Sequence, residues 1–316
     1  MAQHWLDPTL ETVVDVFDNS ARPVLVVDPG DAITVRSLDA SGYTSPQQSP
    51  GGRAPTMFAT FRGHCLTGPI EVRGAEPGDV LAIQLTALRP DDWGWTVSAA
   101  MDNPLNRRLG VADGPASWLL WQLDVEAGTA TDQRGFSRSL APFLGVIGVA
   151  PAEPGEHVTF PPRAGSGGNI DCRELVAGST LYLPVQVPGA LLSLGDGHGA
   201  QGDGEVGGTA IECAMTSEIV VNVVRDRPIS GIHAETPAGR VTFGFNADLN
   251  AATGDALDAM LTWMQSLYGL DRPAALGLAS VAVDLRVTQV ANQTWGVHAV
   301  LPDAVLSVPP GPESVA

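Results

Sequence analysis

The most regular feature of the chain is a succession of short apolar runs separated by glycine and proline. The 316 residues include 36 glycines and 25 prolines, spread over the whole length. Short apolar runs bounded by such turn-forming residues are typical of β-strands. The pattern therefore predicts a mainly β protein with strands of the sandwich or barrel kind. The clearest expected strands are residues 23–27, 32–38, 80–85, 181–187 and 218–224.

One segment near the C-terminus has a helical period instead. Between Asp255 and Leu270, apolar side chains recur every three or four residues, as they do on one face of an amphipathic helix. Thr253 or Asp255 is a suitable N-cap, and Gly269 is suited to end the helix. The pattern predicts a helix near 255–268 whose methionines pack into the core.

The C-terminal part combines helix and strand. Residues 281–287 alternate between apolar and polar side chains, which predicts a strand near 281–290, and residues 273–278 are expected to form a short second helix. We therefore expect a mainly β part over residues 1–215 and a smaller α+β part over residues 216–316. The end of the chain, 308–316, is expected to be a loose tail.

The stretch from Leu194 to Glu212 breaks the apolar pattern most strongly. It reads LGDGHGAQGDGEVGGTAIE and combines acids, one histidine and several glycines. Carboxylates and imidazoles bind metal ions and transfer protons, whereas glycine lets the backbone turn sharply or approach a ligand. Because strands are expected on both sides, we interpret the stretch as a loop that joins two strands of one sheet and carries chemistry.

Two side chains of this stretch are candidate metal ligands. Asp196 and His198 are two residues apart and can converge on one point in a turn. A carboxylate with an imidazole suits a divalent cation, zinc in the first place, with calcium as the alternative. Two ligands do not make a site, so others must come from elsewhere. The further candidates, each in a glycine-flanked stretch, are Asp39, His64, Asp171 and Glu212.

The same stretch offers groups for proton transfer. Glu205 and Glu212 are candidate general bases that would activate a water molecule. Glu212 lies in an otherwise apolar strand, where an ionised carboxylate is costly unless it is paired or bound to metal. Gln201 is a candidate hydrogen-bond donor to a substrate carbonyl oxygen.

Charge and composition exclude several classes of function. All 17 basic residues are arginine, and the formal net charge is −18. Such an acidic chain repels phosphate backbones, so we expect no nucleic-acid partner. The lack of lysine excludes amidases with a catalytic lysine, Schiff-base enzymes and P-loop proteins. The sequence also has no G-x-S-x-G nucleophile elbow.

Location is indicated by features that are missing. The sequence has no apolar run of about 18 residues, so we expect no membrane span, and its beginning lacks the basic and apolar regions of a signal peptide. The three cysteines, Cys65, Cys172 and Cys213, form no C-x-x-C pair. We therefore expect a cytoplasmic protein.

Several stretches, in order, resemble the metal-dependent acetamidase/formamidase family. The longest is GSTLYLPVQVPGALLSLGDGHGAQGDGEVGGTAIE, which is highly specific by itself. The agreement in order of five separate stretches makes a chance match very improbable. The matching stretches are residues 66–85, 142–151, 161–175, 178–212 and 283–302.

The resemblance implies an enzyme that hydrolyses short aliphatic amides to a carboxylate and ammonia. It also implies a bound divalent metal, a small-molecule amide substrate, a mainly β fold with an α+β C-terminal part, and a homo-oligomer. Asp39 matches the family only loosely, and His64 directly precedes a matching element. The residues implicated by the matching motifs are Asp171, Asp196, His198, Gln201, Glu205 and Glu212.

Two alternatives stay open at this point. The tryptophan-rich segment 91–110 matches no known pattern, and it could shape a pocket that shifts specificity away from formamide and acetamide. The substrate would then have a related non-peptide C–N bond, as in a larger amide, a carbamate or a urea-like compound. The other alternative is a non-enzymatic metal-binding protein of the same fold.

Overall fold

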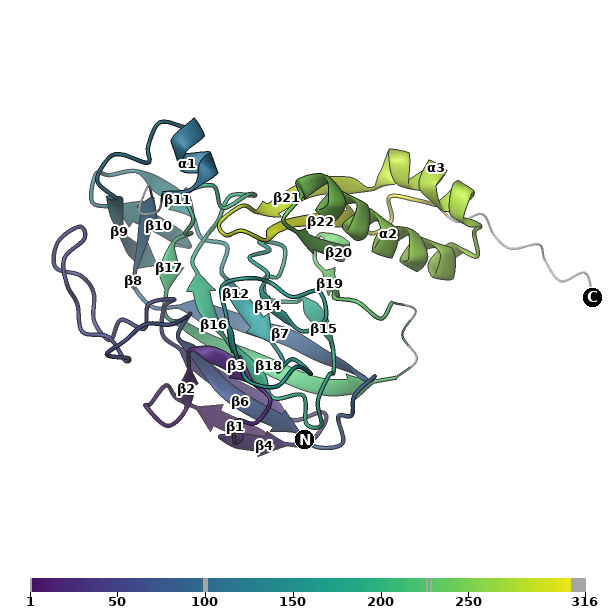
Figure 1. The fold of residues 1–316 in the computed structure, drawn as a ribbon, viewed down its shortest axis with the longest axis horizontal. Helices are drawn as coiled ribbons and strands as arrows, with labels where there is room; N and C mark the ends of the chain where they lie inside the picture. Colours follow the sequence, from purple (N-terminus) through teal and green to yellow (C-terminus); the bar gives the residue numbers. More distant parts are fainter. Residues whose placement is uncertain (1, 99–101, 226, 228, 308–316) are drawn as a thin grey trace, which may run out of the picture.

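The computed structural model describes residues 2–98, 102–225, 227 and 229–307, and it confirms the mainly β fold (Figure 1). Strands hold 41% of the chain and helices 12%, with the C-terminal helices lying among strands. The tail expected at 308–316 lies outside the described residues. Two large sheets and one small sheet hold the strands.

The first large sheet has nine strands and is mostly antiparallel; β1 and β5 alone among its described pairs run parallel. In spatial order the strands are β1 (Gln3–Leu6), β5 (Ala32–Ser37), β18 (Met215–Val224), β7 (Val80–Pro90), β15 (Thr180–Pro184), β19 (His233–Thr236), β20 (Gly239–Asn246), β22 (Trp295–Leu301) and β21 (Asp284–Gln289).

The second large sheet has eleven strands, and β16 lies at its centre. Its main path is β11 (Ser137–Ser139), β10 (Thr129–Asp132), β9 (Ser117–Asp124), β8 (Trp93–Ser98), β17 (Glu212–Cys213), β16 (Leu192–His198), β12 (Phe143–Gly148) and β14 (Gly167–Asn169). Off this path, β6 (Leu66–Val72) pairs with β16 and also with β2 (Val13–Val14) and β4 (Leu25–Val27). The small sheet joins β3 (Val16–Asp18) and β13 (Glu156–Val158).

The main core forms from apolar side chains of both large sheets. Ile83 and Leu85 of β7 join Leu144 and Ile147 of β12 in one buried cluster, and all four are fully buried. Since side chains alternate between the two faces of a strand, each sheet offers an apolar face to this cluster. The core therefore supports the second sheet, which contains β16, the strand of Asp196 and His198.

The helical part confirms both expected helices. Helix α2 (Leu249–Tyr268) packs against β20 and β22, and α3 (Arg272–Ala282) packs beside it (Figure 1). Gly269 ends α2 with φ 65°, as expected of a left-handed C-cap. The start of the helix was predicted too late, because the Asp248 side chain caps it by accepting the N–H of Asn250. A short helix, α1 (Pro104–Arg108), was not predicted.

Several expected boundaries shift. The strand expected near 281–290 is β21, and residues 281 and 282 end α3 instead. The strands β15 and β16 follow each other in the chain but belong to different large sheets. The division at residue 215 stays a prediction; β18 begins there and pairs with β5 and β7 inside the nine-stranded sheet. Within the described part of the chain, none of the helices combines the length and apolar character that crossing a bilayer requires.

Candidate active site

Strand β16 carries the first two site residues. Asp196 and His198 were expected in a loop, but the backbone pairs them into the sheet between β12 and β17. As residues i and i+2 of a strand, they point to the same side. The register also places Glu212 of β17 directly opposite His198. The sheet thus brings together three side chains of metal-ligating types without a loop.

The carboxylates of Asp196 and Glu212 both approach the Nε2 atom of His198. This atom lies 3.5 Å from Oδ2 of Asp196 and 3.3 Å from Oε2 of Glu212. His64 approaches Asp196 as well, with its Nε2 atom 4.0 Å from Oδ2. All four residues are buried.

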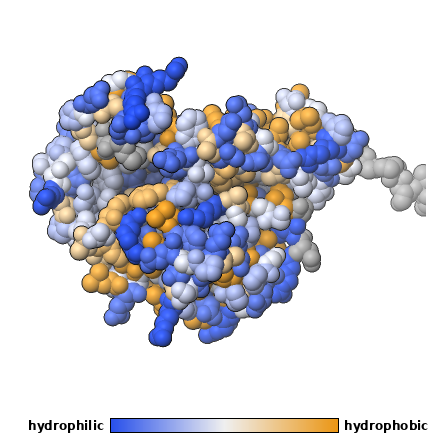
Figure 2. Space-filling model, viewed as in Figure 1, coloured by the Kyte–Doolittle hydropathy of each residue, from blue (hydrophilic) through white to orange (hydrophobic). Residues whose placement is uncertain are grey.

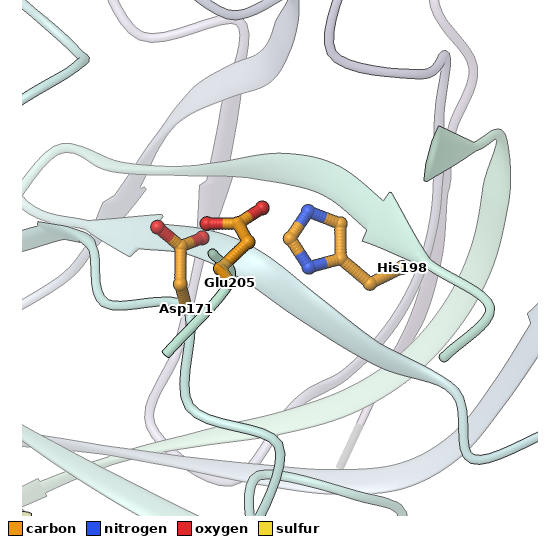
Figure 3. Close-up of side chains that lie close together, drawn as sticks. All are labelled: Asp171, His198 and Glu205. Atoms are coloured by element: carbon orange, nitrogen blue, oxygen red, sulfur yellow. The ribbon is translucent and has the colours of Figure 1, made fainter. Parts of the chain in front are cut away.

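Asp171 and Glu205 form a second group around His198 (Figure 3). Ligand atoms of these three residues all lie within 4.8 Å of one another, as do those of Asp196, His198 and Glu212. Asp171 follows β14, and Glu205 lies in the segment between β16 and β17. His198 is therefore shared by two groups, each of which contains two carboxylates.

Three of the four site carboxylates have a left-handed backbone. The φ angles are 52° at Asp171, 59° at Asp196 and 42° at Glu205. For residues other than glycine such conformations cost about 1–3 kcal/mol each and gather at functional sites. The fold therefore keeps the backbone in conformations of unfavourable free energy at three of the residues whose carboxylates meet.

Gln201 orients the central histidine. Its Oε1 atom lies 2.9 Å from Nδ1 of His198, and its Nε2 donates to the backbone oxygen of Asp171 at 2.7 Å. With Nδ1 as the donor to Gln201, the lone pair of Nε2 faces Asp196 and Glu212. The expected role of Gln201 as a donor to substrate stays a prediction, but both ends of its amide already have partners inside the protein.

Burial and neighbouring charges shift the protonation of the site in opposite directions. Burial raises the pKa of Glu205 to about 8 and that of Glu212 to about 7, although His198 acts against both rises. Burial alone would also raise the pKa of Asp196, but His64 and His198 outweigh it and lower the value. Burial opposes protonation of His198, yet Glu212 and Asp196 raise its pKa well above the usual range. The site therefore strongly favours a positive charge at its centre.

The donor set fits a divalent cation. Both carboxylate oxygens of Asp171 and Oε2 of Glu212 are buried and accept no hydrogen bond. Among the described residues, the ion pairs of Asp196 and Glu212 are all with histidine. Buried carboxylate oxygens that accept no hydrogen bond are costly unless they bind a cation. These oxygens and the imidazole of His198 can therefore hold a metal ion.

Gly145 of β12 lies directly against the side chains of this site. A Cβ atom built on Gly145 would contact Oδ2 of Asp196 and would lie 2.7 Å from Oδ1 of Asp171 and 2.8 Å from Cε1 of His198. The Gly145 oxygen also accepts the N–H of Asp171 at 3.1 Å. Gly145 could not be singled out from the sequence, because its role depends on strands that meet only in the fold.

We expect Gly145→Ala to reduce metal binding, and to reduce about 100-fold the amide hydrolysis that the family resemblance implies, since a displacement of about 1 Å in a catalytic group can cost that much. Metal analysis and ammonia release measure the two effects. Gly277→Ala is the matched control, because nothing lies within 4 Å of its added Cβ. Wild-type metal content and activity in Gly145→Ala would contradict this account of the site.

Asp39 lies near the site but has other partners. Its Oδ1 accepts the backbone N–H groups of Ser41 and Tyr43, and its Oδ2 accepts the indole N–H of Trp95 at 3.2 Å. Burial raises the pKa of Asp39 to about 7, although the Tyr43 and Trp95 hydrogen bonds oppose the rise. Its expected role as a metal ligand stays a prediction, but its contacts are those of a turn residue that anchors Trp95.

His64 is held toward the site by a residue that the sequence did not indicate. Both its backbone N–H and its Nδ1 atom lie within hydrogen-bond distance of Oγ1 of Thr159, at 2.7 and 2.8 Å. Burial lowers the pKa of His64, with Asp196 opposing and His198 adding to the effect. A neutral imidazole with Nε2 toward Asp196 is a suitable metal ligand.

The cysteines take no part in this geometry. All three are free and buried. Burial raises the pKa of the Cys65 thiol to about 12, and it also raises the pKa values of the Cys172 and Cys213 thiols. A thiol needs its ionised form to act as a nucleophile, so the site offers metal and carboxylate chemistry rather than thiolate chemistry.

The site opens into a cavity of about 900 Å³. Figure 2 shows this face hollowed below the lobe that carries α1, with hydrophobic residues gathered along the lower edge. From the segment 91–110, Trp95 and residues 102–105 line the cavity, whereas residues 99–101 lie outside the described residues. The site carboxylates that line it are Asp171, Asp196, Glu205 and Glu212.

Comparison with known proteins identifies the family of this chain. The acetamidase/formamidase family model matches residues 11–154 and 152–308, which is nearly the whole chain. The chain belongs to the acetamidase/formamidase family. Members of this family are amidases, and the site described above lies within the matched residues.

Individual relatives are similar at moderate identity. A formamidase of Methylophilus methylotrophus is 28% identical over 253 residues, covering 64% of this chain and 62% of its own length. The acetamidase structure from Bacillus halodurans has a TM-score of 0.82 at 28% identity, covering 93% of this chain and 96% of that one. The acetamidase structure from Yersinia enterocolitica has a TM-score of 0.83 at 26% identity, covering 96% and 93%. The chain spans less than two thirds of the length of the first curated relatives it matches.

Proposed function

We propose that the protein hydrolyses linear amides to a carboxylate and ammonia with a divalent metal ion bound at His198. The observation that carries the proposal is the cluster of four carboxylates around the imidazole of His198. Three buried oxygens of this cluster, two of Asp171 and one of Glu212, accept no hydrogen bond. Family membership supports the reaction class. Short aliphatic amides such as formamide and acetamide are the first expected substrates.

We assign Asp196, His198 and Glu212 to hold the metal ion. The Nε2 atom of His198 faces both carboxylates, and His64 brings a second imidazole to within 4.0 Å of Oδ2 of Asp196. Asp171 is a further candidate ligand. A mixed set of imidazole and carboxylate suits zinc better than calcium, which prefers oxygen ligands alone. Such an ion supplies Lewis acidity, because it polarises a carbonyl oxygen and makes water more acidic.

Glu205 is the best candidate to move the proton. Its carboxyl lines the cavity beside His198 and has a pKa raised toward neutrality by burial. A base with such a pKa can take a proton from the attacking water and pass it to the leaving nitrogen. Glu212 is less free, since its Oε1 accepts the N–H of Ala210 at 2.8 Å. Protonation of the nitrogen lets ammonia leave.

Ammonia release from formamide, acetamide and propionamide by the metal-loaded protein tests the reaction. We expect release above the rate without protein for at least one of the three. A protein with bound metal that releases no ammonia from any amide would overturn the proposal and favour a non-enzymatic metal-binding role. Cytoplasmic location and homo-oligomeric assembly stay predictions from the sequence.

A further inference from the structure

The cavity above the site is far larger than a short aliphatic amide requires. Its volume is about 900 Å³, whereas pockets of about 300–1,000 Å³ typically enclose molecules of drug size. Acetamide would fill only the floor, where the carboxylates and His64 lie. The rest of the space can hold a larger group of the substrate, and the residues that line it indicate the chemistry of that group.

An aromatic wall leads from the site toward the solvent. The ring of Phe160 lies edge-on to His64, with centroids 5.0 Å apart, and 6.0 Å from the ring of Phe61. All three residues line the cavity. The side chains of Phe160 and Phe61 are 38% and 48% exposed, so their rings remain accessible. Accessible rings beside a buried polar site can bind an apolar group by edge-to-face or offset contact.

The position of Phe160 is fixed by hydrogen bonds. Its backbone oxygen accepts from Nδ2 of Asn169 at 3.0 Å and from Nδ2 of Asn292 at 3.1 Å. The preceding residue, Thr159, holds His64. Phe160 therefore directly follows the residue that holds the imidazole of His64, which fixes the distance from the reacting centre to the aromatic wall.

Most of the remaining lining is apolar or neutral; Asp102, which also lines the cavity, is paired with Arg107. Trp95 is buried and held by Asp39, and Leu105 of α1 and Trp295 of β22 add further apolar surface. The floor carries several carboxylates, which disfavour an anionic substrate. The lining therefore suits an uncharged, apolar substituent.

We propose that the preferred substrates are amides whose carbonyl carbon carries an aryl or similarly bulky apolar group, bound against Phe61 and Phe160. This inference rests on the proposed amide hydrolysis and names the substrate class within it. The reaction is unchanged: the C–N bond breaks, water supplies the oxygen of the carboxylate, and the nitrogen leaves as ammonia.

The ratio of kcat/KM for 2-phenylacetamide to that for acetamide tests the inference on the metal-loaded protein. We expect a ratio of at least about 100, because one methylene in an apolar pocket already gives about 10–200-fold. Phe61→Ala and Phe160→Ala should each lower this ratio about tenfold or more. Phe136→Ala should leave it unchanged, since Phe136 is 67% exposed and is not among the residues lining the cavity. A wild-type ratio near one, or a ratio unaffected by both variants, would overturn the inference.

A binding measurement separates this inference from the proposed reaction. Calorimetric titration of the metal-loaded Glu205→Gln variant should show 2-phenylacetamide binding at least about tenfold more tightly than acetamide, and Phe61→Ala in the same background should abolish that preference. Equal affinities would overturn the inference even if acetamide is hydrolysed. Absence of ammonia release from every amide would overturn the proposed reaction instead. Melting temperatures of the variants show whether they fold.

Discussion

His198→Ala is expected to lose nearly all bound metal and to lower kcat/KM for an amide by more than about 1,000-fold. His198 is the one residue common to both groups of candidate ligands at this site. Changing residues that only orient metal ligands costs about 10–100-fold in affinity or activity, so removing the shared ligand should cost more. It would also leave the buried carboxylates without the imidazole that faces them. Metal analysis of the purified variant and ammonia release measure the result.

His157→Ala is the matched control for this change. His157 lies in β13, away from the cavity lining, and its Nε2 contacts the backbone oxygen of Glu153 at 2.9 Å. We expect the control to keep wild-type metal content and activity. If His198→Ala folds, binds a full complement of metal and hydrolyses amides at the wild-type rate, the site has been assigned to the wrong residues.

Glu205→Gln is expected to keep its metal but to lower kcat about 10²–10⁴-fold, the usual contribution of a positioned proton-transfer group. Glutamine has nearly the same shape but cannot accept the proton. The fold should not suffer, because burial raises the pKa of Glu205 to about 8 and its ionised form is therefore unfavourable in the folded state. Glu126→Gln, on an exposed turn, should change neither activity nor metal content. Loss of metal from Glu205→Gln would identify Glu205 as a ligand instead of a base.

The pH dependence tests the same role. A base acts in its ionised form, so kcat/KM should fall as the pH drops through the pKa of Glu205. That pKa is about 8 from burial and the neighbouring charges, and a bound cation favours the ionised form. The midpoint of the acid limb should therefore lie below about 8 in the metal-loaded enzyme. Glu205→Gln should lack this limb, whereas an unchanged limb would assign it to another group.

The sequence singled out most of the side chains that the structure brings together around His198. Several carboxylates lie among glycines, and Glu212 lies in an apolar strand. Burial of an ionised carboxylate costs free energy unless it is paired or bound to a cation, so such positions indicate a functional site. The structure brings Asp171, Asp196, Glu205 and Glu212 to His198, as the resemblance to the family implied. Short apolar runs likewise predicted the mainly β fold, because strand formation depends strongly on local pattern.

What the sequence could not show depends on contacts between distant segments. Gly145 matters because β12 lies beside β16, and Thr159 matters because it meets His64 from 95 residues away. Glycines on both sides of Asp196 were a local sign of its left-handed backbone, whereas Asp171, between Ile170 and Cys172, has no glycine beside it. The start of α2 was misplaced because Thr253 and Asp255 resemble caps, while Asp248 makes the capping contact.

Reversible removal of the metal tests the central claim most directly. The purified protein is stripped with a chelator, its metal content is measured, and ammonia release is assayed before and after zinc is restored. We predict that activity falls in proportion to the metal removed and returns with about one equivalent of zinc per site, as expected if the ion supplies the Lewis acidity. Full activity in protein shown to contain no metal would contradict the account.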